Sequence, residues 1–307
     1  MSLELCLDAI RSSEEALPNS LLYHLSDLSA AEVVDFASAW KTAEPERKTP
    51  ILDRLIDLSQ DRTELDFSAV FRRCLKDDEE GVRQRAIEGL WEHEERRLIS
   101  PLCDLLAHDP APSVRAAAAV GLGKFAELAQ QGKLLPKDGP QIEECLLAAL
   151  QDETEELLVR RRSLEAAGVL NSPQVDEFIR WAYASEDLSM KGSALYAMGR
   201  TGEAHWLECL VKETRSPSPP LRFEAANACA QLEEEDAVPH LIPLMVDDDL
   251  QVQLSAIRAA GAIGGPLAKK ALRRCIKEGD AAVEDAARES LEMVDAMEDV
   301  YSFNYLR

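Results

Sequence analysis

Aromatic residues, closely spaced metal ligands and long apolar runs are what this sequence of 307 residues has least of. Phe, Trp and Tyr make up 5% of the chain, whereas alanine is abundant, so small side chains must fill much of the interior. No apolar run reaches the length of about 18 residues that a membrane span needs, and no basic start precedes a long apolar run at the N-terminus. We therefore expect a cytoplasmic protein that does not enter a membrane.

Sites for metals and for common catalytic chemistry are also missing. The histidines are far apart, and no two cysteines have the C-x-x-C spacing of a zinc site. The sequence contains no nucleophile elbow, no P-loop and no glycine motif for dinucleotides. We therefore predict no catalytic residue, no metal and no cofactor, and nothing in the sequence indicates an enzyme.

Positive charge is scarce as well. The chain has 34 Lys and Arg against 57 Asp and Glu, a formal charge of −23. Nucleic-acid binding needs Lys and Arg to neutralise phosphates, and anionic lipid repels an acidic surface. We therefore predict no nucleic-acid partner and no membrane partner. The negative surface either steers a basic protein or serves only to keep the chain soluble.

The seven cysteines are odd in number, scattered along the chain and mostly surrounded by leucines. Such cysteines are typical of free thiols that fill gaps in a core. We therefore predict buried free thiols at Cys6, Cys74, Cys103, Cys145, Cys209, Cys229 and Cys275.

What the sequence does contain is a repeat. One helix-like pattern occurs seven times, each copy marked by an apolar anchor residue that usually precedes a basic one. The steps between anchors are 32, 45, 31, 31, 31 and 31 residues. A period of about 20 to 50 residues is typical of a solenoid, whose units bury their faces against their neighbours. The anchors are Val82, Val114, Val159, Met190, Leu221, Val252 and Val283.

Each copy predicts the second helix of a hairpin. Counted from the anchor, offsets 4, 7 and 8 are small and apolar in nearly every copy, which forms one stripe on a helix. Glycine at offset 9 in four copies is interpreted as a helix end: Gly123, Gly168, Gly199 and Gly261. A polar or acidic turn separates each copy from a shorter apolar helix before it. These first helices are predicted over 67–75, 98–106, 142–150, 175–183, 204–212, 237–245 and 267–276.

The pattern D-x-x-x-x-V-R-x-x-A-x-x-G/A-L-G resembles the HEAT repeat, especially the short bacterial form named for phycobilisome lyase subunits. Segments 77–83 and 109–115 carry its Asp and Val-Arg positions fully, and the resemblance covers about residues 67–296. It implies an all-α fold, a right-handed α-solenoid of stacked HEAT-like helical hairpins, whose second helices line the concave side.

The resemblance also implies a ladder of Asp–Arg pairs between neighbouring repeats. The column of basic residues fails at Gln253 and Glu284, so we expect the ladder to weaken toward the C-terminus. Its members are Arg83, Arg115, Arg160, Lys191 and Arg222.

The N-terminal segment 1–66 is helical but irregular. Ser29 and Glu32 have the spacing of a capping box, and residues 45–58 look like a degenerate copy of the repeat helix. An atypical first unit is typical of a cap that covers the exposed end of a stack. We therefore predict that residues 1–66 form an N-terminal cap.

Seven repeats are predicted over 67–297. An inserted loop at 129–141, rich in Gly and Pro, is either a tolerated insertion or a binding loop. The aromatic tail 298–307 either folds back onto the last helix or acts as a peptide ligand.

The remaining candidate site is a surface. On each second helix, offsets 2, 3, 6, 9 and 10 lie opposite the buried stripe, which the resemblance places on the concave side. Aromatic and arginine side chains exposed there are typical of a protein-binding hot spot, although each residue alone is equally consistent with an ordinary surface position. The predicted patch consists of Arg161, Arg162, Glu165, Tyr196, Arg200, Phe223, Asn227, Leu254, Arg258, Glu88 and Trp91.

We therefore predict a non-enzymatic scaffold or adaptor in a bacterial cytosol, which presents a preorganised concave surface to another protein. The sequence specifies neither that partner nor an oligomeric state. Two alternatives stay open. The resemblance includes subunits of bilin-type lyases or chaperones, which need a deep apolar pocket. Some HEAT-like folds are DNA glycosylases with a basic concave face, for which Arg160–Arg162 is the only basic cluster here.

Overall fold

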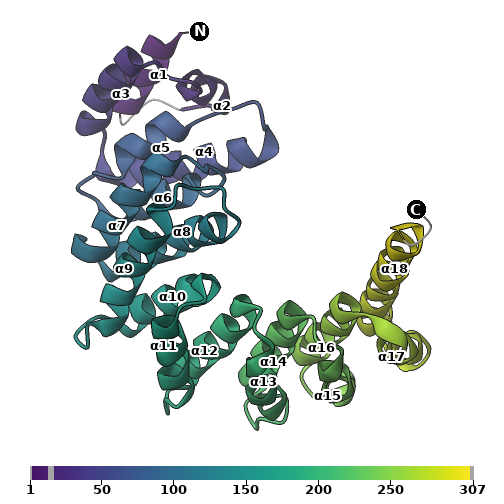
Figure 1. The fold of residues 1–307 in the computed structure, drawn as a ribbon. Coiled ribbons are helices and arrows are strands. Elements are labelled where there is room, and N and C mark those ends of the chain that lie inside the picture. Colours follow the sequence, from purple (N-terminus) through teal and green to yellow (C-terminus); the bar gives the residue numbers. More distant parts are fainter. Residues whose placement is uncertain (1, 13–16, 305–307) are drawn as a thin grey trace. The chain divides into compact units, whose positions relative to one another are not determined.

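The computed structural model describes residues 2–12 and 17–304, with side chains described as far as residue 296, and its regular elements there are all helices (Figure 1). The helices pair into hairpins that pack against their neighbours as an α-solenoid. The predicted all-α solenoid fold is thus confirmed. Within the described ranges, no helix combines the length and the apolar character needed to cross a membrane.

Two compact units make up the chain. Unit 1 comprises Met1–Arg162 and unit 2 comprises Ser163–Arg307, so the division falls inside helix α10 (Leu157–Ala167). In each hairpin we call the first helix the A helix and the second, which carries the anchor residue, the B helix.

Unit 1 opens irregularly and continues as hairpins. The predicted capping box is present: the Ser29 hydroxyl accepts the Glu32 N–H and the Glu32 carboxylate accepts the Ser29 N–H. The opening elements are α1 (Leu3–Arg11), α2 (Asn19–Leu22), the 3₁₀ turn η1 (Tyr23–Leu25), α3 (Ala30–Thr42) and α4 (Pro45–Asp61). The hairpins that follow are α5 (Ser68–Cys74) with α6 (Glu80–Gly89), η2 (Arg96–Leu98) and α7 (Ile99–His108) with α8 (Pro112–Gln130), and α9 (Asp138–Gln151) with α10.

Unit 2 contains four hairpins after the short turn η3 (Gly168–Leu170). Predicted first and second helices are present in each, although some A helices begin or end as 3₁₀ turns. In order they are α11 (Pro173–Tyr183) with α12 (Leu188–Thr201); η4 (Ala204–Trp206) and α13 (Leu207–Glu213) with α14 (Pro219–Leu232); η5 (Glu235–Ala237), α15 (Val238–Leu241) and η6 (Ile242–Val246) with α16 (Leu250–Ile263); and α17 (Gly265–Glu278) with α18 (Ala281–Asn304).

The stripe of small residues forms the seams between helices, as its period predicts. Ala118, Ala225 and Ala256, all at offset 4, are fully buried. In unit 2, the B helices α12, α14 and α16 pack directly on one another in chain order. Because methyl groups fill these seams, the helices approach closely and leave no room for a larger side chain.

Of the four glycines at offset 9, Gly168 follows the end of α10 as predicted, whereas Gly123, Gly199 and Gly261 lie inside helices. Gly199 and Gly261 lie inside α12 and α16, so their interpretation as helix ends is wrong. A Cβ atom on Gly199 would lie 2.8 Å from the Cα of Ala228, and one on Gly261 would lie 2.6 Å from the Cβ of Ser290. Glycine is therefore required there because the next B helix comes too close for any side chain.

Helices α12 and α14 end at offset 12 instead. Gly202 and Glu233 occupy the left-handed region there, with φ of 67° and 55°. Glycine adopts this conformation without strain, whereas a residue with a Cβ does not.

The inserted segment is more helical than predicted. Of the expected loop 129–141, only residues 131–137 lie outside helices, because α8 continues to Gln130 and α9 begins at Asp138. The Asp138 carboxylate accepts the Leu135 N–H and pairs with Arg96, which fixes the segment to η2. At the other end, α18 runs to Asn304. Residues 298–304 therefore continue the last helix and do not fold back onto it, so that alternative is wrong. Residues 305–307 and the side chains of 297–304 lie outside the described residues, so a role as a peptide ligand stays a prediction.

Candidate functional site

In unit 1, a ladder of ion pairs joins successive B helices to the turn of the next hairpin. The Arg83 guanidinium donates two parallel hydrogen bonds to Asp109, of 2.6 and 2.8 Å, and both side chains are nearly buried. Arg115 binds Glu155 in the same bidentate way, at 2.8 and 2.7 Å. The hydrogen bond from Arg83 to Asp109 raises the pKa of that guanidinium, so the pair stays ionised.

The ladder continues within unit 2. Arg222 donates two hydrogen bonds of 2.7 Å to Asp247, which hold the pKa of that carboxyl below its usual range. Lys191 lies 2.8 Å from Glu213. Burial alone would raise the pKa of Glu213, but the hydrogen bonds from Lys191 and Tyr183 bring it below its ordinary value. At the next position, Gln253 reaches only the backbone carbonyl of Asp247, which matches the predicted weakening toward the C-terminus.

One ion pair of the ladder starts from α4, in the segment 45–58 where the repeat is degenerate. Lys48, on α4, is nearly buried and lies 3.1 Å from Asp77, which also accepts the indole N–H of Trp40 at 2.8 Å. Residues 45–58 had been identified as a repeat-like helix, but Lys48 was not assigned to the ladder. Its position in the first turn of that helix was the one sequence feature that could have assigned Lys48 to the ladder.

A second row of polar contacts joins neighbouring B helices, with a buried serine as the donor. The residue at offset 3 of one B helix binds the residue at offset 6 of the preceding one. The Ser193 hydroxyl donates to Glu165 at 2.6 Å, and the Ser255 hydroxyl donates to Asn227 at 2.8 Å. Glu165 and Asn227, both members of the predicted patch, therefore serve first to join neighbouring helices.

Three apolar side chains of the patch have no such role. Tyr196, Phe223 and Leu254 are half-buried on the consecutive helices α12, α14 and α16 of unit 2. Phe223 and Leu254 share offset 2, and the Ser255 hydroxyl lies 3.3 Å from the Phe223 carbonyl, so the two side chains belong to adjoining positions. Partly exposed aromatic and aliphatic side chains on consecutive helices are suited to packing against another molecule.

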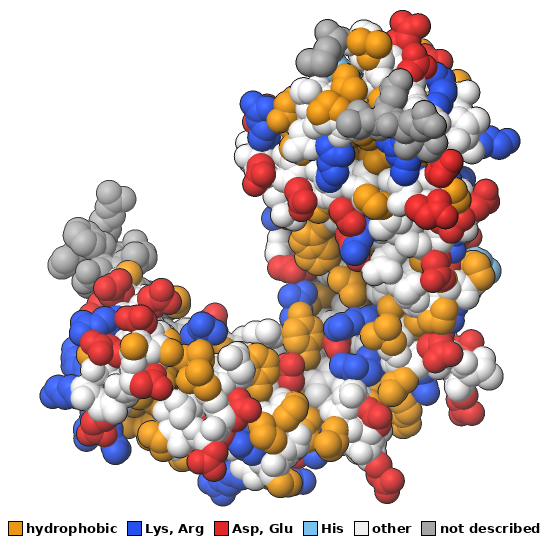
Figure 2. Space-filling model, turned by 180° about the vertical axis from the view of Figure 1, so that it is seen from behind, with side chains coloured by type: hydrophobic (Ala, Val, Ile, Leu, Met, Phe, Trp, Pro, Cys, Tyr) orange, Lys and Arg blue, Asp and Glu red, His pale blue; other side chains and the backbone are white. Residues whose placement is uncertain are grey.

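The arginines of the patch differ in exposure. Within unit 2, Arg200 is half-buried and Arg258 is exposed. Arg161 and Arg162 are half-buried in unit 1. Figure 2 shows one face of the molecule, on which acidic, basic and hydrophobic side chains alternate rather than form a field of one charge.

Two further patch members, Glu88 and Trp91, lie at the end of α6 in unit 1. Glu88 binds Arg85 at 2.5 Å and is thus paired within its own helix. The Trp91 ring is 47% exposed, and the Lys124 ammonium lies 5.9 Å from its centre while donating to the Trp91 carbonyl. Lys124 was not predicted as a site residue, because it is distant in sequence.

A small cavity of about 20 Å³ lies beside Trp91. It is lined mainly by apolar side chains, together with Gly121, His93 and Lys124. That volume suffices for about one water molecule or a methyl group, and for no larger ligand.

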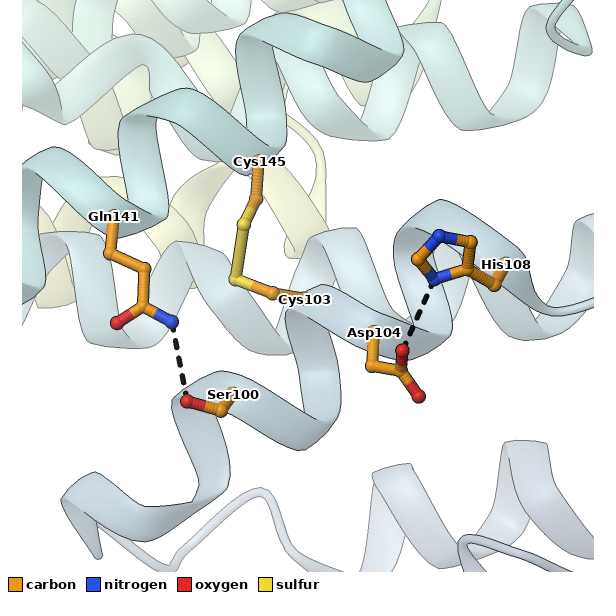
Figure 3. The surroundings of a disulfide bond; sticks show 6 residues. All are labelled: Ser100, Cys103, Asp104, His108, Gln141 and Cys145. Atoms are coloured by element: carbon orange, nitrogen blue, oxygen red, sulfur yellow. Dashed lines mark hydrogen bonds and ion pairs between the residues drawn. A yellow bond between two sulfur atoms is a disulfide. The ribbon is translucent and has the colours of Figure 1, made fainter.

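One cysteine prediction is wrong. Cys103 of α7 and Cys145 of α9 form a disulfide between two consecutive A helices, with 5.7 Å between their Cα atoms (Figure 3). A hydrogen bond from Gln141 to Ser100 joins the same two helices one turn away, at 3.2 Å. No local pattern predicts this pair, because its members are 42 positions apart and the inserted segment lies between them.

The other five cysteines are free thiols, as predicted. Cys6, Cys74, Cys229 and Cys275 are also buried as predicted, whereas Cys209 is only half-buried, so the burial predicted for it is wrong. Burial raises the pKa of the Cys6 and Cys229 thiols to about 12, so both are inert at neutral pH. Among the described residues, no group of three or more His, Cys, Asp or Glu side chains is placed to hold a metal ion.

Comparison with known proteins identifies the repeat as a HEAT repeat. The sequence profile of the family described as HEAT repeats matches residues 68–137 and 207–292. No curated protein matches the chain.

Solved structures resemble it in fold. The structure of the CpcE–CpcF complex of phycocyanin lyase from Nostoc sp. PCC7120 is similar over 75% of this chain and 94% of that chain, at 16% identity and a TM-score of 0.50. A crystal structure of importin beta is similar over 99% of this chain but 48% of that chain, at 14% identity and a TM-score of 0.51. Identities this low are evidence for the fold alone.

Proposed function

Since the chain belongs to the family of HEAT-repeat proteins, we propose that it is a non-enzymatic scaffold that holds another protein on the B helices of unit 2. The observation that carries the proposal is the group Tyr196, Phe223 and Leu254, which stay half-exposed on three consecutive helices. The fold does not bury these apolar side chains fully, so they can pack against an apolar surface of a partner.

The surroundings of this group favour a preformed site. The hydrogen bonds from Ser193 to Glu165 and from Ser255 to Asn227 tie neighbouring B helices together beside the apolar side chains. Rigid helices lose little conformational entropy when a partner binds, so more of the contact energy appears as affinity. Arg258, which is exposed, supplies a charge that can pair with an acidic group of the partner.

The test is affinity purification from the native host with the wild-type chain and with the Tyr196→Ala, Phe223→Ala double variant. Truncation of a hot-spot aromatic commonly costs about 2 kcal/mol or more of binding, so the double variant should lose the protein that the wild-type chain retains. Its melting temperature should barely change, because both rings are half-exposed. Leu267→Ala, an exposed residue of α17, is the matched control.

Two results would contradict the proposal. If the double variant unfolds, the two rings contribute to the core rather than to a surface. If it remains stable and still retains the partner, the binding surface lies elsewhere, and residues 131–137 become the next candidate.

A lyase or chaperone subunit for a bilin is the second candidate, motivated by the fold similarity to the phycocyanin lyase complex. A bilin needs a deep pocket of several hundred Å³, whereas the cavity beside Trp91 measures about 20 Å³. Absorbance titration of the chain with a bilin tests this candidate, and a saturable spectral shift would support it. The third candidate, a DNA glycosylase, is disfavoured by the net charge of −23.

A further inference from the structure

A second unpartnered surface lies at the edge of unit 2 where the B helices begin. The first residues of α12, α14 and α16 are Leu188, Pro219 and Leu250, and each follows the last by 31 residues. Leu188 is 57% exposed and Leu250 is 42% exposed. Proline is common at the first position of a helix, but nothing in the fold requires an exposed leucine there.

The three residues form a row of regular pitch. Their helices pack directly on one another, and at Gly199 the approach is too close for a side chain. Helices packed in this way have axes about 8–10 Å apart, so equivalent residues at their starts are separated by about that distance. Val246, which is 74% exposed, adds apolar surface in the turn before Leu250.

Acidic residues flank both leucines. Glu186 and Asp187 precede Leu188, and Asp248 and Asp249 precede Leu250. Asp187 and Asp249 accept backbone N–H groups as helix caps, so their charges are partly used within the fold. Glu186 and Asp248 are exposed.

The turn of the middle hairpin is different in composition. It carries Pro217, Ser218 and Pro219 in place of the acids, so this turn adds no negative charge between the acidic turns before Leu188 and Leu250. Arg215, shortly before this turn, is exposed, and its guanidinium lies 3.5 Å from His240. The edge is therefore an apolar row with negative charge at both ends.

We propose that this edge binds an extended, basic segment of another protein, with an apolar side chain at every third residue. A polyproline II chain advances about 3.1 Å per residue with three residues per turn, so equivalent side chains recur about every 9 Å. That pitch matches the row of Leu188, Pro219 and Leu250. Lys or Arg at the intervening positions then meets Glu186 and Asp248. Pro219 and Leu250 lie one helical turn before Phe223 and Leu254, so this row adjoins the Tyr196–Phe223–Leu254 group but consists of other side chains.

The probe is a fluorescent peptide of four tandem Leu-Arg-Pro units, titrated into the full chain and followed by anisotropy. Two control peptides separate spacing from charge. One has the same composition with its leucines adjacent, and the other has Glu in place of Arg. The tandem peptide should bind most tightly, and its affinity should fall as salt screens the acidic positions.

Variants locate the site. Leu188→Ser with Leu250→Ser should raise the Kd of the tandem peptide about tenfold or more, as loss of interface anchors does. Met293→Ser, an exposed apolar residue of α18, is the matched control and should leave the Kd unchanged. Tyr196→Ala alone should also bind the peptide normally, because Tyr196 lies about two turns from Leu188 on α12, and this variant separates the proposal from the scaffold function.

Three results would overturn the proposal. Equal binding of the peptide with adjacent leucines would show that the edge does not select a three-residue spacing. An unchanged Kd for the double serine variant would place the site elsewhere. Absence of binding by the tandem peptide at low salt would show that the row is not a docking surface.

Discussion

Unit 1 and unit 2 hold their repeats together by different means. In unit 2 the anchors Met190, Leu221, Val252 and Val283 are 31 residues apart throughout, and each B helix fits the next through alanine and glycine seams. In unit 1 the steps are 32 and 45 residues. That unit contains the disulfide and the most deeply buried ion pairs of the ladder. Regular repeats are stabilised mainly by complementary shape, whereas irregular junctions depend more on specific bonds.

The largest loss of stability should come from disrupting the packing between the B helices of unit 2. Ala225→Arg places a charged side chain in a seam where the alanine is fully buried. Overpacking and an unpaired buried charge together should destabilise unit 2 by about 3 kcal/mol or more. Hydrogen exchange read by mass spectrometry should show loss of protection over α12, α14 and α16. Ala184→Arg, at an exposed alanine, is the control and should change little. An unchanged melting temperature for Ala225→Arg would mean that the stripe is misassigned.

The ladder should matter more in unit 1 than in unit 2. Asp109→Ala removes the only carboxylate described within salt-bridge distance of the nearly buried Arg83, which keeps hydrogen bonds to two backbone carbonyls. Loss of such a buried ion-pair partner typically costs about 3–5 kcal/mol. Asp247→Ala should cost less, because Arg222 is more exposed to water than Arg83. Chemical denaturation of both variants measures the difference. A larger loss for Asp247→Ala would contradict the contrast drawn between the units.

Loss of the disulfide should weaken unit 1 alone. Cys103→Ser, or reduction of the wild-type chain, should remove about 2–4 kcal/mol of stability, since the crosslink restricts the unfolded chain. Amide protection should fall over α7 and α9 and stay unchanged over α12 to α16. Cys209→Ser removes a free thiol of unit 2 and serves as the control. If a reductant has no effect on either unit, the crosslink contributes nothing to the junction.

The smallest effect should be a gain in unit 2. Glu233 ends α14 with a φ of 55°, where the equivalent residue of α12 is Gly202. Glu233→Gly should stabilise the chain by up to about 1 kcal/mol, because glycine adopts left-handed backbone without strain. A matched Glu234→Gly change, at a residue of extended backbone, should be neutral or destabilising. Destabilisation by Glu233→Gly would show that its side chain makes a contact that outweighs the strain.

The sequence predicted the features that repeat. The hairpins, the alanine seams, the capping box and the ladder pairs all follow from a local pattern that recurs or from a short motif. Gly199 and Gly261 were placed correctly in the pattern but given the wrong role. Their role depends on how closely the next helix approaches, which spacing along one chain does not reveal.

Features that occur once could not be predicted in the same way. The pairing of Cys103 with Cys145 depends on the register of α9 after the insertion, and Lys48 lies where the repeat signal fades. In the candidate patch, Tyr196, Phe223 and Leu254 are half-exposed, in agreement with the helical phase deduced from the sequence. Ser193 and Ser255, at offset 3 of the same predicted face, are instead buried against the preceding helix. The engagement of Glu165 and Asn227 by serines of the next helix was not foreseen, because it requires the lateral alignment of two helices.

The disulfide also has a mechanical consequence. It closes a covalent ring that contains α8, residues 131–137 and the start of α9, with its two cysteines 42 positions apart. When the ends of the chain are pulled apart, the residues inside that ring cannot add to the extended length of the chain. At about 3.6 Å per extended residue, the oxidised chain should therefore be about 150 Å shorter at full extension than the reduced one. Force applied through the solenoid would bypass α8, which makes this hairpin the segment best shielded from tension.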